Sequence, residues 1–382
     1  MVYDLIPFLL IAPAFCYGLI TLVCARRFFS RPAVTSKDSP PVTILKPVKG
    51  VDAESFENFS SFCEQDYPLY QIVFAVASPD DPVVPVIERL IGVYPAVDIE
   101  LVIDDRIHGP NYKVCNLMHA YPKAKYDLLV ICDSDIRVGP RYLQEVAASF
   151  QEPAVGLVTS LYRSSRVPTA ATALEAMGFT TEMIPNVMAA LYLEGLSFAL
   201  GASMVVRREA LEKIGGFPAL VDYLADDYQL GNMVHHAGYR LELSGYFVES
   251  VMKCESLQGI LSRQLRWART MRASRPGGYL ASGIILPVPA AFLALFVSGF
   301  SYFGWTAFTL LGLSRLCCGL VFSRIFVCDN LFPRYLWLLP LRDILAFCTW
   351  ALSFLGNRVV WRSHVFRVLP GGTIRDLGKK IT

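Results

Sequence analysis

The sequence predicts an α/β domain with a mixed, mainly parallel sheet, flanked by membrane-spanning helices at both ends of the chain. Of the 382 residues, 54% are hydrophobic and only 18% are charged, and the mean hydropathy is +0.42. Soluble domains usually contain about 25% charged residues, so a membrane component is expected. Between the apolar ends, short β-branched runs alternate with amphipathic segments, a pattern typical of βαβ units.

Residues 1–30 form the predicted N-terminal anchor. Residues 5–25 contain no charged side chain. This segment is long enough to cross a hydrocarbon core of about 30 Å. No basic region precedes them and no small-residue cleavage site is evident, so an uncleaved anchor is favoured over a signal peptide. Arg26, Arg27 and Arg31 follow, before a polar linker over 32–41. Because positive residues mark the cytoplasmic side of a span, we expect the central domain at the cytoplasmic face.

The central segment 42–260 is the predicted catalytic domain. Its apolar strand-like runs are Val42–Leu45, Ile72–Ala77, Ile99–Ile103, Leu128–Cys132, Gly156–Thr159 and Ala202–Val206. Helical patterns lie between them, at 82–93 and 140–150. In parallel sheets of this kind, ligands bind at the carboxyl ends of the strands, so the functional residues are sought there. The net charge of +2 gives no reason to expect nucleic acid as a partner.

The C-terminal part is predicted to return to the membrane. A basic interfacial helix is expected over 261–279, membrane segments over 280–356 and a basic cytoplasmic tail over 357–382. We favour two spans and one interfacial or re-entrant segment after residue 280, because three complete spans would place the basic tail on the opposite side from the central domain. Arg342 and Asp343 interrupt the last apolar segment, and we expect them to pair at the interface.

Two acidic motifs are candidates for the chemistry. Asp133 and Asp135 directly follow the run Leu128–Cys132, and carboxylates at this position suit Mg²⁺ or Mn²⁺, which also bind substrate phosphates. Asp-x-Asp also occurs in ordinary turns, so the motif alone is a weak signal. Asp227, in Asp226-Asp227-Tyr228, could remove a proton from an attacking hydroxyl group. Helix capping is the simpler alternative for one member of that pair.

Two other groups of residues could contact a nucleotide. Arg263, Arg266 and Trp267 lie in a basic run before the C-terminal spans, and two arginines at i and i+3 can hold a diphosphate. A helix on the membrane surface would also contain such cations and an interfacial Trp. Lys113 and Asn116 lie between two predicted strands, where a loop could reach the nucleotide.

The ordered series of these motifs resembles the ceramide glucosyltransferase branch of the inverting GT-A glycosyltransferases. The resemblance covers about 42–275 by motif and the flanking spans by order. Its signature is D, DxD, D and (Q/R)xxRW. It assigns Asp98 to the first position, Asp133 and Asp135 to the DxD pair, Asp227 to the catalytic base, and Arg263, Arg266 and Trp267 to the last motif.

The resemblance implies a UDP-sugar donor, a divalent metal and transfer of one hexose to a membrane lipid, with ceramide as first choice. The segments LVDYLADDYQLG and NRVVWRSHVFRV also look like bacterial enzymes that glycosylate hopanoids, which would imply N-acetylglucosamine and a hopanoid acceptor. A processive synthase would need more spans. A membrane lipid-binding protein without catalytic activity is the alternative of another class.

Overall fold

The computed structural model describes residues 2–32, 38–362 and 364–379, with side chains from Asp4 onwards. Residues 33–37 of the predicted linker and Lys380 of the basic tail lie outside the described residues. The chain divides into two compact units. The sheet unit contains residues 32–166 and 196–253, and the helical unit contains residues 1–31, 167–195 and 254–382. The predicted 42–260 domain is therefore divided, because 167–195 and 254–260 group with the apolar helices.

The sheet unit is built on eight strands in the order β3-β2-β1-β4-β7-β6-β8-β5. The strands are β1 (Val42–Pro47), β2 (Tyr70–Val76), β3 (Asp98–Ile103), β4 (Leu128–Cys132), β5 (Ile136–Arg137), β6 (Val155–Arg166), β7 (Ser203–Arg207) and β8 (Arg240–Val251). Strands β3, β2, β1 and β4 are parallel, whereas β7 runs antiparallel to both β4 and β6. The predicted mixed α/β sheet is confirmed.

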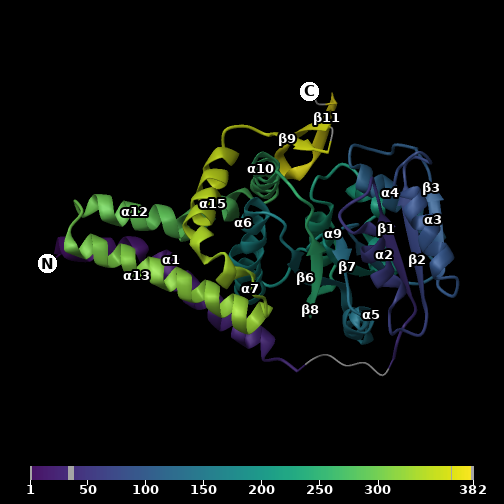
Figure 1. Cartoon of the computed structure of the whole chain (residues 1–382), viewed down its shortest axis with the longest axis horizontal. Helices are drawn as coiled ribbons and strands as arrows, with labels where there is room; N and C mark the ends of the chain where they lie inside the picture. The colour runs from purple at the N-terminus through teal and green to yellow at the C-terminus, as the bar shows by residue number, and fades with distance from the viewer. Residues whose placement is uncertain (1, 33–37, 363, 380–382) are drawn as a thin grey trace. The chain divides into compact units, whose positions relative to one another are not determined.

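Helices cover this sheet (Figure 1). They are α2 (Ser55–Cys63), α3 (Val84–Val93), α4 (Tyr112–Ala120), α5 (Tyr142–Ala147), α8 (Arg208–Lys213) and α9 (Asp226–His236). Every residue of β1 and β4 is buried, which explains why these strands are continuous apolar runs rather than alternating ones. One charged exception, Lys46 in β1, is fully buried.

Strand β8 was not predicted from the sequence. It contains Glu242, Gly245 and Glu249, and its residues alternate irregularly between buried and exposed positions. It pairs in parallel with β6 over most of its length, with register shifts that include one between Ser160 and Leu161. Such bulges break the two-residue periodicity by which a half-buried strand is recognised in a sequence.

The helical unit contains the apolar helices and the basic helix α10. They are α1 (Val2–Phe29), α6 (Ala170–Gly178), the π-helical turn η3 (Phe179–Met183), α7 (Ile184–Leu193), α10 (Leu257–Ser274), α11 (Pro276–Ala281), η5 (Ser282–Ile285), α12 (Pro287–Val297), α13 (Tyr302–Val321), α14 (Leu331–Arg334) and α15 (Leu339–Ser353). Helices α1, α12 and α13 pack side by side around small residues such as Ala14, Ala294 and Ala307 (Figure 1).

Among the described residues, three helices are long and apolar enough to cross a membrane: Asp4–Phe29, Tyr302–Val327 and Leu336–Ser353. The pair Pro276–Ile285 and Pro287–Val297 also passes this test together, but it is bent by 53°, as in a broken span or a re-entrant loop. Apolar helices at both ends of the chain are thus confirmed. The number of C-terminal spans stays a prediction.

Arg342 and Asp343 differ from our expectation, because each has another ionic partner. Arg342 Nη2 lies 2.6 Å from Glu182 Oε2, and Asp343 Oδ1 lies 2.9 Å from Arg315 Nη2. Both side chains are buried. Consecutive residues on a helix project in different directions, so they reach different neighbours.

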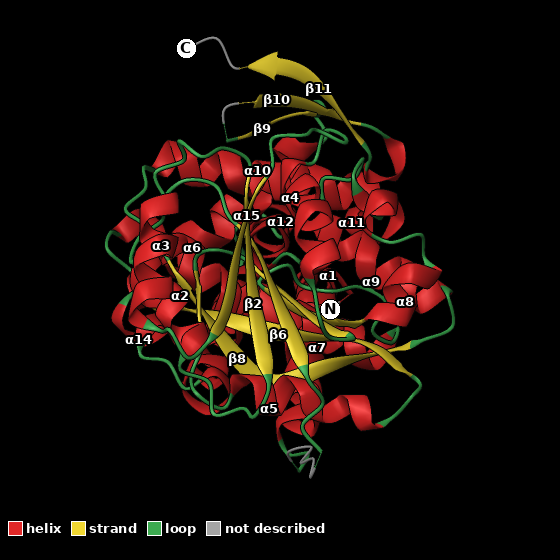
Figure 2. Cartoon of the chain, turned by 90° about the vertical axis from the view of Figure 1, so that its right-hand side faces the viewer, coloured by secondary structure: helices red, strands yellow, loops and turns green. Residues whose placement is uncertain are grey.

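The basic tail folds into a second sheet, which the sequence analysis did not predict. Its strands are β9 (Arg358–Trp361), β10 (His364–Val368) and β11 (Ile374–Lys379), arranged as an antiparallel meander (Figure 2). Phe366 and Val368 are buried, and Trp361 contacts Phe366. Within the same unit, α10 packs against β9.

A pair of helical glycines tests the packing of the sheet unit. A Cβ added at Gly231 in α9 would lie 2.4 Å from the backbone nitrogen of Ala199, whereas one added at Gly92 in α3 would meet nothing within 4 Å. We expect Gly231→Ala to destabilise the protein by about 1–3 kcal/mol. Gly92→Ala is the matched control, and it should be neutral or stabilising by up to about 1 kcal/mol. Melting temperatures of the purified variants check this, and equal values would contradict the packing at α9.

Candidate active site

The Asp133–Asp135 turn is fixed by contacts from two other segments of the sheet unit. The buried Lys46 donates from Nζ to the main-chain oxygen of Asp133, at 2.9 Å. Ser134 donates from Oγ to Asp52 Oδ2, at 2.6 Å. Strand β4 ends at Cys132 and β5 begins at Ile136, so the turn lies at the carboxyl edge of the parallel strands. This is the edge at which ligands are expected in open α/β sheets.

Lys113 links the two acidic motifs. Its Nζ lies 2.8 Å from Asp133 Oδ1 and 3.3 Å from Asp226 Oδ2. It occupies the first turn of α4, whose N-cap is Asn111: the Asn111 side chain accepts from the Val114 N–H. The amide of Asn111 also donates to the main-chain oxygen of Tyr223, at 2.7 Å. The start of α4 is thereby joined to the segment preceding α9, and motifs almost a hundred residues apart meet at one cation.

Asp227 lies in the first turn of α9, but neither it nor Asp226 caps that helix. The N-cap is Ala225, and no side chain caps the helix there. Asp227 Oδ1 instead accepts from the N–H of Tyr228, at 2.8 Å. A Cβ added at Gly201 would lie 2.7 Å from Asp227 Oδ2, so the missing side chain at Gly201 leaves room for this carboxylate. The capping alternative is therefore excluded.

The site concentrates carboxylates around two cations. Burial, together with the charges of Asp133 and Asp52, raises the pKa of Asp135 to about 7. Burial and the neighbouring Asp226 raise the pKa of Asp227 to about 6. Complete burial lowers the pKa of Lys46 to about 8.

The pKa of Lys113 shifts in the opposite direction to that of Lys46. Burial alone would lower its pKa, but the carboxylates of Asp133, Asp226 and Asp227 outweigh burial and raise it above the usual value. Lys113 is therefore a permanent positive charge, whereas Asp227 can exchange a proton near neutral pH.

The carboxylate oxygens of Asp133 and Asp135 suit a hard divalent cation that also binds the phosphates of a substrate. Within residues 2–32, 38–362 and 364–379, no group of three His, Cys, Asp or Glu side chains is arranged to hold a metal. Asp133 and Asp135 supply two carboxylates, and burial, followed by the charges of Asp133 and Asp52, raises the pKa of Asp135 to about 7. Mg²⁺ typically binds through one or two carboxylates and completes its shell with water and phosphates. Asp133 and Asp135 would therefore hold a divalent cation, with water or substrate phosphates as its other ligands.

Asn116 and Asp98 do not join this cluster. Asn116 is buried, and its amide donates to the main-chain oxygens of Val48 and Ala75, which ties α4 to the ends of β1 and β2. Asp98 begins β3, at the amino-terminal edge of the sheet, and pairs with Lys125 at 2.6 Å. The carboxylate at the opposite end of β3 is Asp104, held by Arg106. A direct role for Asp98 or Asn116 in nucleotide binding stays a prediction, and this geometry does not favour it.

The Arg263, Arg266 and Trp267 motif lies on α10, in the helical unit. The Arg263 guanidinium group forms ion pairs with Glu175 and Glu255, and the Glu175 side chain is almost fully buried. The guanidinium carbon of Arg266 lies 6.0 Å from the ring centre of Trp267 and 5.8 Å from that of Trp361. Within its own unit, the motif therefore connects α10 to α6 and to the C-terminal sheet. Its contact with a diphosphate stays a prediction.

Asn111 and Gly201 belong to the site but were not identified from the sequence. Asn111 caps the helix that carries Lys113, and Gly201 leaves room for Asp227. An Asn two residues before Lys113 and just ahead of a helical pattern is a recognisable N-cap signal. No local signal marks Gly201, because its role depends on a contact with a residue 26 positions away.

Comparison with known proteins agrees with this architecture. The family described as "Glycosyl transferase family 21" matches residues 6–374. "Ceramide glucosyltransferase 3" of Caenorhabditis elegans is 28% identical over 352 residues, which is 88% of this chain and 74% of that protein. "Ceramide glucosyltransferase" of Candida albicans is 39% identical, but over only 121 residues, or 28% of this chain and 22% of that protein.

A solved structure shares the fold. It is the mannosyltransferase PcManGT from Pyrobaculum calidifontis in complex with GDP-Man and Mn²⁺, with a TM-score of 0.55 and 18% identity. The match covers 92% of this chain and 99% of that one. The GT-A-type fold is thereby confirmed.

The Lys113 link can be tested through stability. Lys113→Met leaves Asp133, Asp226 and Asp227 close together without their cation, and we expect a loss of roughly 3 kcal/mol. Because Asp227 has a raised pKa of about 6, its repulsion appears as pH rises through that value. The deficit in melting temperature should therefore be larger at about pH 8 than at about pH 5.

Lys253→Met is the matched control for this experiment, because Lys253 is largely exposed and lies 3.8 Å from Asp52. Its effect should be small at both pH values. A deficit for Lys113→Met that does not change with pH would contradict the role assigned to the carboxylate cluster.

Proposed function

The chain belongs to glycosyl transferase family 21, and on that premise we propose that it transfers one hexose from a UDP-sugar to a hydroxyl group of a membrane lipid, with inversion. Glucose is the first choice of sugar and a ceramide-type lipid the first choice of acceptor. The names of its relatives support this choice, since both proteins compared above are called ceramide glucosyltransferases. N-acetylglucosamine and a hopanoid acceptor are the second choice.

One observation carries the proposal: Lys113 brings the carboxylate pair suited to a metal next to the pair that contains a candidate base. The proposed transfer uses both. A divalent cation held by Asp133 and Asp135 would stabilise the charge on the departing diphosphate. Asp227, with its raised pKa, would hold the proton released by the acceptor hydroxyl.

The reaction balances with the residues of this site. The acceptor oxygen attacks the anomeric carbon, its proton passes to Asp227, and the bond between the anomeric carbon and the diphosphate oxygen breaks to release UDP. One displacement inverts the anomeric centre. Lys113 would remain charged throughout and compensate Asp133 and Asp226 as Asp227 becomes neutral.

The proposed location is a membrane, with the sheet unit at the cytoplasmic face. Arg26 and Arg27 occupy the last turn of α1, which supports a cytoplasmic end for that helix. For Arg263, Arg266 and Trp267, we propose a contribution to diphosphate binding, which the match to the (Q/R)xxRW motif supports.

The candidate base is tested by Asp227→Asn. We expect kcat for transfer to ceramide to fall by about 10²–10⁴-fold, because the amide cannot accept the proton, while the KM for UDP-glucose changes little. In the unmodified protein, kcat should fall as pH drops below about 6, where Asp227 becomes protonated. The measurement is formation of radiolabelled glycolipid by the purified protein, with the anomeric configuration determined by NMR.

Asp222→Asn is the control for this test, because Asp222 is exposed and lies five residues earlier. It should retain full activity. Normal activity of Asp227→Asn would remove Asp227 as the base. If the protein binds lipid but consumes neither UDP-glucose, UDP-N-acetylglucosamine nor GDP-mannose, the lipid-binding alternative is favoured.

The metal site gives a separate expectation. Chelation of divalent cations should abolish transfer, and added Mg²⁺ or Mn²⁺ should restore it. Asp133→Asn and Asp135→Asn should raise the metal concentration needed for half-maximal activity by at least about tenfold. Asp80→Asn, at an exposed position, should leave it unchanged. Full activity in the presence of a chelator would show that this transfer does not depend on the cation.

A further inference from the structure

The helical unit contains a partly open cavity of about 280 Å³. Residues of α1, η3, α7, α10, η5, α13 and α15 line it, and its surface is mainly apolar. Ile285, Leu286 and Phe322 form part of the apolar wall. This volume is near the lower end for ligand sites, so it suits a lipid headgroup with the first part of its chains rather than a whole lipid.

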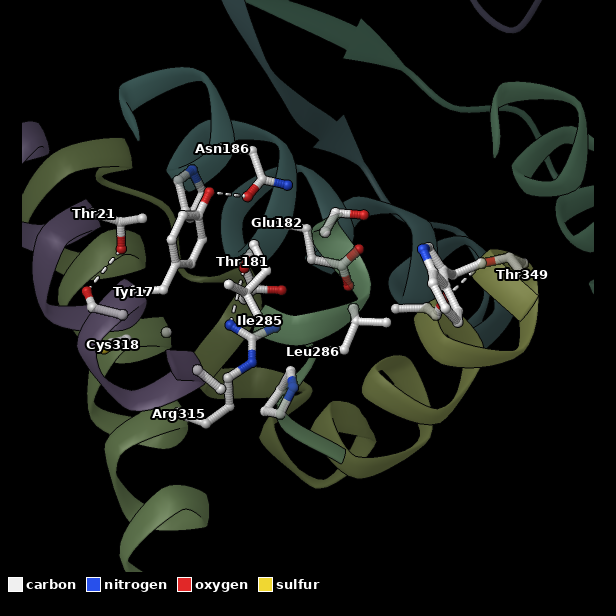
Figure 3. Close-up of a pocket in the computed structure, with 18 of the residues that line it drawn as sticks. Tyr17, Thr21, Thr181, Glu182, Asn186, Ile285, Leu286, Arg315, Cys318 and Thr349 are labelled. Carbon is white, nitrogen blue, oxygen red and sulfur yellow. Dashed lines mark hydrogen bonds between the residues drawn. The ribbon is translucent and has the colours of Figure 1, made fainter. Parts of the chain in front are cut away.

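Polar groups converge in this apolar setting (Figure 3). Tyr17 donates its hydroxyl to Asn186 Oδ1, at 2.7 Å, and Arg315 donates to the main-chain oxygen of Thr181, at 2.9 Å. Glu182 projects among them (Figure 3). Ionisable groups between apolar helices are costly, and they usually mark a binding site.

Glu182 has one carboxylate oxygen in use and one without a partner. Oε2 lies 2.6 Å from Arg342 Nη2, whereas Oε1 is buried and accepts no hydrogen bond. An acceptor left unpaired in this way costs on the order of 1–3 kcal/mol, and more when it is charged. A ligand that donates a hydrogen bond to Oε1 would recover that energy.

The surrounding charges restrict what the ligand can be. Glu182 is balanced by Arg342, and Arg315 is balanced by Asp343. Because these ion pairs are already compensated, a charged headgroup would enter without a counter-ion and would be disfavoured in this apolar cavity. A neutral headgroup with a hydroxyl or amide N–H donor satisfies both the charge balance and the open Oε1.

We propose that this cavity binds the acceptor lipid by its neutral headgroup, with a hydroxyl or amide N–H of the lipid donating to Glu182 Oε1. That the bound lipid is the acceptor rests on the proposed function. The cavity and its chemistry do not depend on that function. Both candidate acceptors fit this description: a ceramide offers an amide N–H and hydroxyls, and a hopanoid polyol offers hydroxyls.

The test is saturation binding of radiolabelled lipids to the purified full-length protein in detergent micelles. The lipids are a ceramide, a hopanoid polyol and phosphatidylcholine, whose headgroup has no hydrogen-bond donor. We expect saturable binding of the ceramide, the polyol or both, and no competition by phosphatidylcholine. The lipid that binds more tightly identifies the preferred acceptor.

Two variants place the binding in the cavity. Ala346→Phe fills part of it from α15, and Glu182→Gln replaces the open acceptor without a change in size. Each should weaken lipid binding by at least about tenfold. Ala281→Phe, the same substitution at an exposed position, should bind like the unmodified protein. A melting temperature close to that of the unmodified protein shows that each variant is folded.

The results separate this inference from the proposed function. Absence of saturable binding, equal competition by phosphatidylcholine, or unchanged affinity in either cavity variant overturns the cavity assignment, whether or not glycolipid forms. Lipid binding that both variants lose, without any sugar transfer by the unmodified protein, supports the cavity and contradicts the transferase.

Discussion

The contact on which the rest of the candidate site depends is the one between Lys113 and the two acidic motifs. Four aspartates, at 133, 135, 226 and 227, are gathered at the carboxyl edge of one sheet, and without a cation their mutual repulsion would oppose that arrangement. Lys113 offsets part of it through Asp133 and Asp226. Burial and the neighbouring carboxylates raise the pKa values of Asp135 and Asp227. These are the two residues for which a metal ligand and a base role are proposed above.

The buried strands and the acidic motifs could be predicted from the sequence because each is local. A run such as Leu128–Cys132 followed by Asp133 is identified without knowledge of the fold. The Lys113 link, the space at Gly201 and the two partners of Arg263 could not be predicted, because each joins distant segments. For Asp98, the motif match predicted a site residue from the sequence. In the structure, the register of β3 places Asp98 at the amino-terminal edge of the sheet.

The C-terminal region shows why composition was insufficient for the tail. Its arginines and lysines predicted a basic cytoplasmic tail and gave no sign of the three-stranded sheet in which Phe366 and Val368 are buried. Short strands with few apolar residues give little periodic signal. Arg342 and Asp343 were expected to pair with each other. Instead, Arg342 pairs with Glu182 and Asp343 pairs with Arg315. In an apolar unit, charge balance is set by neighbouring helices rather than by neighbours in sequence.

The division of the chain has a practical consequence for its biochemistry. The polypeptide passes between the two units at residues 31–32, 166–167, 195–196 and 253–254. Neither unit is a continuous piece, so removal of the N-terminal anchor does not yield an isolated soluble enzyme. It takes α1 away from α7, α12 and α13, against which it packs, and leaves 167–195 as an apolar insertion within the sheet unit. A version that contains the sheet unit alone requires removal of three segments, 1–31, 167–195 and 254–382, and a new linker between residues 166 and 196.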